Sequence, residues 1–315
     1  MHTIRPARKA DLDDLARLWG LCLIHDTLDP QRLERFFDDP AYYEPDAVLV
    51  AEADGAIVGF IIGIANQGDT GWIPAFLVHP EHYAGGVGDS LLRHLEDFFF
   101  SRGIKHVRME PFGGKLHFFT GIDRRYQELL AILSRNGFAV ADDSQVDIVK
   151  DLTSFQMPAW AAKAKESLEE GAFTFGFCEP HLRQAYLEFM TTHFGGYQGW
   201  CIETRKYVEQ AGDPRLRMLA FLSGEIVGFT AYAKEDDWYI WSTGVRKDLR
   251  GKKIASVLVF LALAEMKRRA ATRMCVSDCP IEFYKILEGE VVRRYVMMGK
   301  DLNPSPEPGG RPAPG

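Results

Sequence analysis

The sequence predicts an α/β protein made of two similar domains in tandem, each built on a mixed β-sheet. Three observations support this prediction. The chain has 315 residues, which is enough for two domains of ordinary size. A strand followed by a glycine-containing turn and an apolar helix occurs twice, at Phe76–Leu92 and at Trp241–Val259. The tetrapeptide I-V-G-F also occurs twice, ending at Phe60 and at Phe229.

The two patterns recur in the same order and at nearly the same offset. Val245 follows Val78 by 167 positions (245 − 78), and Gly228 follows Gly59 by 169 (228 − 59). Ordered matches at one offset indicate a duplicated domain. We therefore expect copy one at 1–152, a connector at 153–171, copy two at 172–302 and a disordered proline- and glycine-rich tail at 303–315.

Copy one is predicted from its apolar periodicity and its turn residues. Asp11 is a candidate cap for the first helix, Asp54-Gly55 predicts a β-hairpin, and Gly137 ends the last helix. An irregular stretch rich in glycine and aromatic residues is expected at 111–123. The strands are expected at 2–7, 47–52, 56–64, 70–78, 104–110 and 145–151, and the helices at 11–23, 30–38, 86–102 and 125–136.

Copy two is predicted to repeat this order after a connector with one short helix. Its strands are expected at 173–178, 218–223, 226–233, 238–245, 272–277 and 291–298. Its helices are expected at 180–193 and 203–211, in a long segment ending near Arg269, and at 281–287.

Composition narrows the classes of function. The net charge is −7 and the basic residues are local, which argues against a nucleic-acid-binding protein. No apolar run approaches a membrane span, and Met1 leads directly into a strand-like segment, so we expect a cytoplasmic protein. The five cysteines and nine histidines show no complete metal-ligand spacing, and we expect free thiols and no metal. An acidic surface suits an amine substrate, although it also serves ordinary solubility.

The turn after Val245 is cationic and leads directly into a helix. The first turn of a helix has free backbone N–H groups and the positive end of the peptide dipole, and nearby lysine or arginine adds charge. This arrangement is typical of a phosphate-binding site. A solvated basic turn between two core elements is the alternative.

The two turns together resemble a known loop. V-x-P-x-x-x-x-x-G-x-G ending at Gly88, and G-V-x-x-x-x-R-G-K-x-I-A ending at Ala255, resemble the acyl-CoA loop R/Q-x-x-G-x-G/A of the GNAT acetyltransferase superfamily. The resemblance covers nearly the whole chain except the tail. In layout the chain is similar to tandem GNAT proteins such as mycothiol synthase.

The resemblance implies that acyl-CoA lies along the strand before the loop, with its pyrophosphate on the loop itself. The matching positions of copy one are Phe76, Leu77, Val78, Gly85, Gly86, Val87 and Gly88. Those of copy two are Thr243, Gly244, Val245, Arg250, Gly251, Lys252, Lys253, Ile254 and Ala255.

Each loop departs from the family pattern at one position. Copy one has Tyr83 where arginine or glutamine is usual, and copy two has Lys253 where glycine is usual. Lys253 either crowds the pyrophosphate or binds it with its ammonium group. Neither copy is excluded as the acyl-CoA site.

The resemblance also implies a proton donor. Many members of the family carry a tyrosine in a pattern like F-Y-x-x-L-G-F, and Phe283-Tyr284 matches its start, whereas Leu133 stands at that point of copy one. We therefore expect Tyr284 to protonate the CoA thiolate, the alternative being an ordinary core tyrosine. Three carboxylates are candidate bases, each of which is alternatively a solvated surface group: Glu203, Asp237 and Asp278.

From these features we expect an N-acetyltransferase that moves the acetyl group of acetyl-CoA to a primary amine of a small molecule. Two alternatives remain open at this point. One is a degenerate acyl-CoA-binding module with a sensing or scaffolding role, and the other is a peptide or protein N-acetyltransferase. A monomer and a homodimer are both compatible with the sequence.

Overall fold

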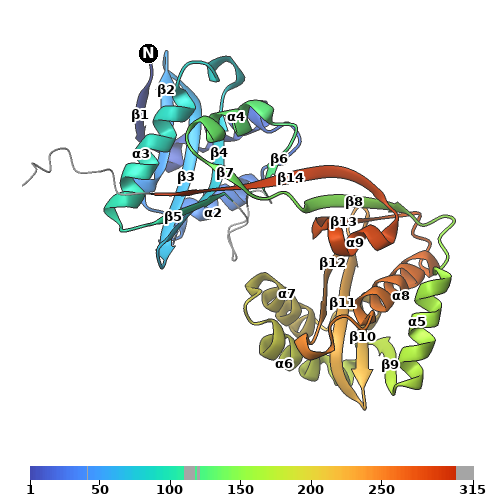
Figure 1. Cartoon of the computed structure of the whole chain (residues 1–315). Coiled ribbons are helices and arrows are strands. Elements are labelled where there is room, and N and C mark those ends of the chain that lie inside the picture. Colours follow the sequence, from blue (N-terminus) through green and yellow to red (C-terminus); the bar gives the residue numbers. More distant parts are fainter. Residues whose placement is uncertain (41, 110–117, 119–120, 303–315) are drawn as a thin grey trace, which may run out of the picture. The chain divides into compact units, whose positions relative to one another are not determined.

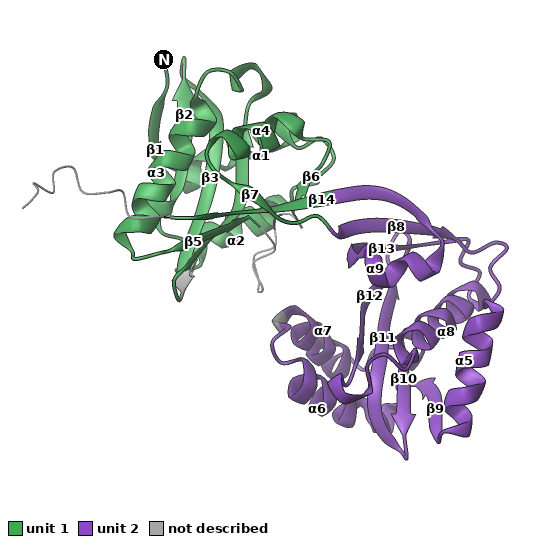
Figure 2. Ribbon diagram, in the orientation of Figure 1, with its two compact units in different colours: residues 1–112, 116–143, 295–315 green, residues 113–115, 144–294 purple. Residues whose placement is uncertain are grey.

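The computed structural model describes residues 1–40, 42–109, 118 and 121–302 (Figure 1). The described chain divides into two compact units. Unit 1 comprises residues up to 143 together with 295–302, and unit 2 comprises 144–294 (Figure 2). The disordered tail expected at 303–315 lies outside the described residues.

Unit 1 is a mixed sheet in the order β1-β2-β3-β4-β5-β14-β7, in which β4 and β5 run parallel and β6 adds to β14. Its strands are β1 Thr3–Pro6, β2 Val48–Ala53, β3 Ala56–Gln67, β4 Thr70–Val78, β5 His106–Met109, β6 Ile122–Asp123, β7 Ala139–Asp142 and the second half of β14 Glu290–Asp301. Its helices are α1 Leu12–Cys22, α2 Pro30–Asp38, α3 Val87–Ser101 and α4 Gln127–Arg135.

Helix α3 packs closely on this sheet because glycines line its path. A Cβ atom at Gly63 would lie 2.3 Å from Leu95, and one at Gly59 would lie 2.8 Å from Leu91. Both leucines are fully buried. The sequence I-V-G-F therefore supplies a gap in the side-chain layer that lets α3 approach β3.

Unit 2 has the strand order β9-β10-β11-β12-β13-β8-β14, with β12 and β13 parallel. Helices α6 and α7 cover one face of this sheet, and α5 and α8 cover the other (Figure 1). The strands are β8 Gln145–Asp151, β9 Phe173–Phe177, β10 Arg217–Leu222, β11 Glu225–Lys234, β12 Trp238–Val245, β13 Arg273–Pro280 and the first half of β14. The helices are α5 Ala159–Glu170, α6 Arg183–Phe194, α7 Gln198–Glu209, α8 Ile254–Arg268 and α9 Ile281–Tyr284.

The closing strands of the two copies are exchanged between the units. Strand β8, the last strand of copy one, lies in unit 2 between β13 and β14. The second half of β14, the last strand of copy two, lies in unit 1 between β5 and β7. The compact units therefore differ from the contiguous domains expected at 1–152 and 172–302. The alternation of apolar residues predicts which face of a strand is buried, but it does not predict which strand will pair with it.

Strand register shows the duplication within each unit. Gly59 pairs with Val78 in unit 1, and Gly228 pairs with Val245 in unit 2. The residue before each long helix has the same left-handed backbone, with φ 71° at Gly86 and 65° at Lys253. The offset read from the sequence therefore corresponds to equivalent positions in the two sheets.

Several local expectations need correction. Helix α7 begins at Gln198 rather than near 203, and strand β7 at Ala139–Asp142 was not expected. Asp11 occupies the cap position of α1, but its carboxylate accepts the Arg8 N–H and binds the Arg5 guanidinium instead of a helix N–H. The carboxylate therefore fastens β1 to the turn before α1.

Candidate functional site

In unit 2 the strand before the loop loses its parallel partner part-way along its length. In unit 2, β12 pairs with β13 only through Ile240, which is opposite Val276. A bulge at Trp241 follows at once, because Ser242 and Ile240 pair with adjacent residues of β11. In the described part of the chain, the edge of β12 from Trp241 to Val245 has no ladder to β13. Such an edge can bind an extended ligand through backbone hydrogen bonds.

The strand before the loop of unit 1 has a closed surface. Among the described residues, β4 pairs with β5 as far as Trp72, and a register irregularity between β3 and β4 follows. Beyond it, Phe76, Leu77 and Val78 are fully buried, and the Cys22 thiol donates to the Val78 carbonyl at 3.1 Å. Pro74, which has no N–H group, lies in the same segment. This strand end is covered by the protein's own side chains.

The equivalent strand end of unit 2 is partly exposed. The Trp241 side chain is 50% exposed, and Thr243 is half-buried. These two residues occupy the strand positions next to the unpaired edge. Of the two sequence-predicted strand segments, Thr243 of unit 2 is partly exposed, whereas Gly244 and Val245 are buried, as are Phe76, Leu77 and Val78 of unit 1.

The loop of unit 2 presents its cations to solvent. Arg250, Gly251, Lys252 and Lys253 are all exposed, and α8 begins at Ile254. The Ile254 side chain is buried, so only its backbone can face a ligand. The Lys253 ammonium lies 5.9 Å from the centre of the Trp160 ring on α5, and its backbone matches that of the glycine in unit 1.

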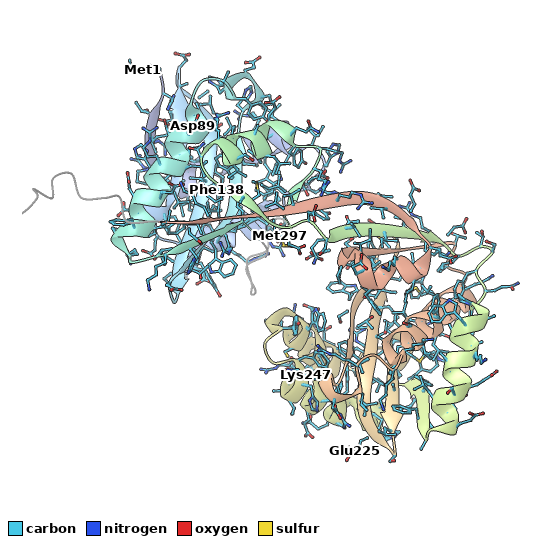
Figure 3. The ribbon with its side chains drawn as sticks, in the orientation of Figure 1. Met1, Asp89, Phe138, Glu225, Lys247 and Met297 are labelled. Carbon is cyan, nitrogen blue, oxygen red and sulfur yellow. The ribbon has the colours of Figure 1, made fainter. Side chains whose placement is uncertain are left out.

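The loop of unit 1 holds a carboxylate at the start of its helix. Asp89, in the first turn of α3 (Figure 3), accepts two hydrogen bonds of 2.8 Å from Arg135 and one of 2.6 Å from Asn136. Arg135 is the main cause of a lowered pKa for Asp89, with burial opposing it. The Arg135 guanidinium offsets the charge of this carboxylate, so the pair adds no net positive charge for a pyrophosphate at this loop. Copy two has Ser256 at the equivalent position (89 + 167).

Tyr284 reaches the open strand from α9. Its hydroxyl donates to the Thr243 hydroxyl at 3.3 Å, and Thr243 is 3.2 Å from the hydroxyl of Thr230. The side chain of Tyr284 is only 6% exposed, and burial raises its pKa, which keeps the phenol protonated at neutral pH. The structure thus brings Tyr284 and Thr243 together, and Leu133 of copy one is a buried core residue.

The three candidate bases differ in their surroundings. Glu203 pairs with Lys206 at 2.8 Å, and Asp237 pairs with Arg273 at 3.5 Å, both near the surface. Asp278 is half-buried in β13, two residues beyond Val276. Its pKa is raised to about 7, mainly by burial and further by the charge of Asp147. Asp278 is therefore the candidate whose environment suits proton transfer near neutral pH.

Sequence reasoning missed Asp147, which comes from copy one. The Asp278 N–H donates to its carboxylate at 3.0 Å, across the contact between β13 and β8. No local signal identifies this residue, because the contact depends on the exchange of β8 into unit 2.

Sequence reasoning also missed an aromatic cluster beside β12. Tyr197 and Trp200 stack with ring centres 4.6 Å apart, and Tyr197 is exposed. Phe194 joins the cluster to the strand, since a Cβ atom at Gly244 would lie 2.6 Å from both Phe194 and Phe229. This cluster lies on the α6 and α7 face of unit 2.

The histidines beside the unit 1 loop, and the cysteines, have ordinary surroundings. His79 and His82 have ring centres 5.7 Å apart, and His79 accepts the Glu81 N–H. Across the described ranges, no group of three His, Cys, Asp or Glu side chains could hold a metal ion, and all five cysteines are free thiols. None of the helices that the structure describes is long and apolar enough to cross a membrane.

Both units have a strand, a loop and a following helix in the same order, and comparison with known sequences identifies the family. The sequence model of the Acetyltransferase (GNAT) family matches residues 12–114 and 180–287, which is more than half of the chain. The chain therefore belongs to the GNAT family of acetyltransferases.

Curated relatives match one part of the chain. An acetyltransferase of Photorhabdus laumondii is 34% identical over 106 residues, which are 33% of this chain and 71% of the relative. An acetyltransferase of Sodalis glossinidius is 32% identical over 108 residues, which are 34% of this chain and 72% of the relative. These relatives support an acetyltransferase.

Solved structures match the two-unit fold. A GCN5-related N-acetyltransferase from Sphaerobacter thermophilus has a TM-score of 0.64 at 20% identity, covering 96% of each chain. A tandem GNAT protein from the clavulanic acid biosynthesis pathway has a TM-score of 0.58 at 14% identity, covering 97% of this chain and all of that one. The GCN5-related glucosamine N-acetyltransferase region of a fungal multi-domain β-N-acetylglucosaminidase has a TM-score of 0.71 at 19% identity. It covers 95% of this chain, which spans 38% of that one. At these identities the similarity concerns the fold.

Proposed function

We propose that this protein transfers the acetyl group of acetyl-CoA to a primary amine of a small molecule, and that unit 2 carries out the reaction. Acetyl-CoA supplies an activated acetyl thioester. The unpaired edge of β12, from Thr243 to Val245, offers backbone groups to its pantetheine arm. The exposed loop 250–253 and the backbone at the start of α8 offer positive charge and N–H groups to its pyrophosphate.

The observation that carries this proposal is the asymmetry between the two strand ends. Unit 2 combines a strand end with a half-buried Thr243, a cationic loop and the Tyr284 hydroxyl on Thr243. Unit 1 has a buried strand end and the carboxylate of Asp89 at its loop. We therefore assign unit 1 a structural role.

The protein's own residues would contribute orientation and proton transfer. Backbone hydrogen bonds from β12 hold the thioester at a fixed position beside the strand, where β12 no longer pairs with β13. Tyr284, kept protonated by its burial, gives a proton to the departing sulfur. The stacked rings of Tyr197 and Trp200 provide an apolar, electron-rich surface for an acceptor that carries an ammonium group.

The proposal includes a cytoplasmic protein whose partner is a small amine, with no role for nucleic acid or a membrane. The acidic net charge of −7 favours a cationic acceptor over an anionic one. Either a monomer or a homodimer fits this activity. Glucosamine belongs among the first amines to test, because a structurally similar fungal region is a glucosamine N-acetyltransferase.

Calorimetry with acetyl-CoA and a thiol-release assay over a panel of amines test this function. The double variant Arg250→Ala with Lys252→Ala should bind acetyl-CoA more weakly by about 1–3 kcal/mol, because charge-assisted hydrogen bonds are lost. Lys165→Ala with Lys206→Ala removes two cations of unit 2 from other helices and serves as the matched control.

Two results would count against the proposal. Unchanged affinity in the folded loop variant would exclude this loop as the pyrophosphate site. Acetyl-CoA binding without thiol release on any amine would favour a binding module over an enzyme.

A further inference from the structure

We propose that Trp160 of α5 and Lys253 of the unit 2 loop form a subsite for the nucleotide end of acetyl-CoA. In this subsite the adenine ring stacks on the indole of Trp160, and the ammonium group of Lys253 binds a phosphate. The inference rests on the acetyl-CoA binding proposed above for the loop 250–253. It gives the connector between the two copies a part in binding the acyl donor, because Trp160 lies within that connector.

Helix α5 places Trp160 beside the start of α8. The two helices pack together on one face of the unit 2 sheet (Figure 1). The Trp160 ring lies edge-on to Phe260 of α8, with ring centres 5.5 Å apart and ring planes at 80°. Phe260 is buried and stacks with Phe155, whose ring centre lies 6.3 Å away. A buried aromatic pair therefore fixes the indole close to the first turns of α8.

The indole offers an accessible aromatic surface at this place. Trp160 is 40% exposed, whereas its neighbour Ala161 is fully buried. Every nucleobase has a π-face, so an exposed tryptophan ring can bind adenine by stacking. The contact with Phe260 already restricts the ring, and a tryptophan side chain has only two χ angles, so little conformational entropy is lost when a base stacks on it.

The side chain of Lys253 connects this surface with the loop. Lys253 is the N-cap residue of α8, and its ammonium lies 5.9 Å from the centre of the Trp160 ring. Among the described residues, no carboxylate forms an ion pair with this ammonium. A cation over an exposed ring is held weakly, so a phosphate that accepts charge-assisted hydrogen bonds can replace the ring as its partner. This exchange also frees the ring face that the ammonium covers.

The charge around Lys253 suits the nucleotide end of CoA, which carries a diphosphate and a 3′-phosphate. Residues 246–253 include five cationic side chains and one carboxylate, Asp248. Arg246 binds that carboxylate at 2.8 Å and offsets its charge. Lys252 and Lys253 are exposed, and the N–H groups at the start of α8 add the positive end of the helix dipole. The loop therefore has more than one cation available for the phosphates.

Unit 1 differs at both of the positions that build this arrangement. The N-cap of α3 is Gly86, which has no side chain to place over a ring. The residue equivalent to Phe260 is Arg93 (260 − 167), and it is exposed. A buried aromatic residue under α5 and a lysine at the N-cap thus occur together in unit 2, which also has the cationic loop.

The subsite would select the acyl donor. A thioester of free CoA carries adenine, whereas an acyl group on a phosphopantetheine arm, as on a carrier protein, carries one phosphate and no adenine. Only the first donor can use Trp160. The protein should therefore prefer acetyl-CoA to S-acetyl-4′-phosphopantetheine, which has the same thioester.

Calorimetry on the full chain with these two donors tests the subsite. The parent should bind acetyl-CoA at least about 10-fold more tightly than S-acetyl-4′-phosphopantetheine, and Trp160→Ala should weaken acetyl-CoA binding about 10-fold. The Kd of S-acetyl-4′-phosphopantetheine should stay unchanged in that variant. Trp160→Leu should give the same result while it keeps an apolar side chain against Phe260. Phe100→Ala, at an exposed aromatic residue of unit 1, is the matched control.

Lys253→Met tests the phosphate contact separately. The substitution keeps the length of the side chain and removes its charge. Acetyl-CoA should bind about 10-fold more weakly, and its Kd should depend less steeply on salt concentration. Lys234→Met removes an exposed cation at the other end of β11, where Lys234 pairs with Trp238, and should bind acetyl-CoA like the parent.

The outcomes separate this subsite from the proposed function. Folded Trp160→Ala and Trp160→Leu variants with the parent's Kd for acetyl-CoA would overturn the subsite and leave the proposed function standing. An equal loss of affinity for both donors in these variants would also overturn it, because Trp160 would then support the loop rather than bind adenine. A parent that binds no acetyl-CoA would overturn the proposed function and the subsite with it.

Discussion

Replacing Tyr284 by phenylalanine separates a proton donor from a core aromatic residue. The substitution keeps the ring, which packs edge-on against Phe283 at 4.7 Å, and removes only the hydroxyl. The hydrogen bond lost is the 3.3 Å contact to Thr243, and Thr243 keeps its neighbour Thr230 at 3.2 Å. We therefore expect a cost in unfolding free energy of about 0.5–1.5 kcal/mol, the net value of one neutral hydrogen bond.

The expected effect on turnover is much larger. Loss of a general acid lowers rates by about 10²–10⁴, and a thiolate is already a fair leaving group, so kcat should fall by about 10². The Kd of acetyl-CoA should change little, because the phenol contacts Thr243, which the proposed function places at the thioester end of the site, away from the loop 250–253. A thiol-release assay gives kcat, calorimetry gives Kd, and urea unfolding gives stability.

Tyr232→Phe is the matched control for this experiment. Tyr232 is a fully buried tyrosine of the same unit, and its hydroxyl has no hydrogen-bond partner among the described residues. Removing a buried, unpaired hydroxyl should raise stability by about 1 kcal/mol and leave kcat unchanged. If Tyr284→Phe turned over an accepted amine as fast as the parent, Tyr284 would be a structural residue, and orientation alone would have to explain the activity.

Three further predictions concern the loop, Asp278 and the exchanged strand. Lys253→Gly should raise the unfolding free energy by up to about 1 kcal/mol, because glycine adopts the φ of 65° at this position more readily than lysine does. Urea unfolding measures this change. A large loss of stability would instead show that the contact of Lys253 with Trp160 matters more than the backbone conformation. The raised pKa of Asp278 makes the folded state bind a proton that the unfolded state has released, so its ionisation costs stability as pH rises from about 4 to 7. The difference in unfolding free energy between Asp278→Asn and the parent should therefore be more favourable to the variant at pH 8 than at pH 4, by at most about 4 kcal/mol. The same difference at both pH values would contradict a raised pKa of Asp278. Deleting residues 295–315 should unfold unit 1 and spare unit 2, and amide hydrogen exchange that stayed slow in β5 would refute this.

Much of the local structure is predictable because it depends on local patterns. The helix at 30–38 and the strands at 70–78, 145–151 and 238–245 have the bounds expected from the sequence. Alternation of apolar residues fixes a buried strand, and proline after a capping aspartate fixes the start of α2. The repeated loop further indicated the family, which the family model confirms.

Only part of the candidate site could be predicted from the sequence. The contact of Tyr284 with Thr243 fits the expectation that both belong to one site, although the catalytic role of Tyr284 stays a prediction. Asp147 could not be found, because its contact with Asp278 spans copy one and copy two. The difference in exposure between Phe76 and Thr243 was equally hidden, since it depends on which side chains cover each strand end.

The exchanged strands have a consequence for the order in which the protein is completed during synthesis. Every described residue of unit 2 lies between 144 and 294, so unit 2 can close before the chain is finished. Unit 1 waits for residues 295–302, although its own first strand is made at the start. At about 5–20 residues per second, roughly 160 residues separate β7 from the end of β14, a delay of about 10–30 s. Throughout that time the edges of β5 and β7 can pair with a strand of another nascent chain. Unit 1, whose first residues are synthesised first, is therefore the last unit to complete its sheet.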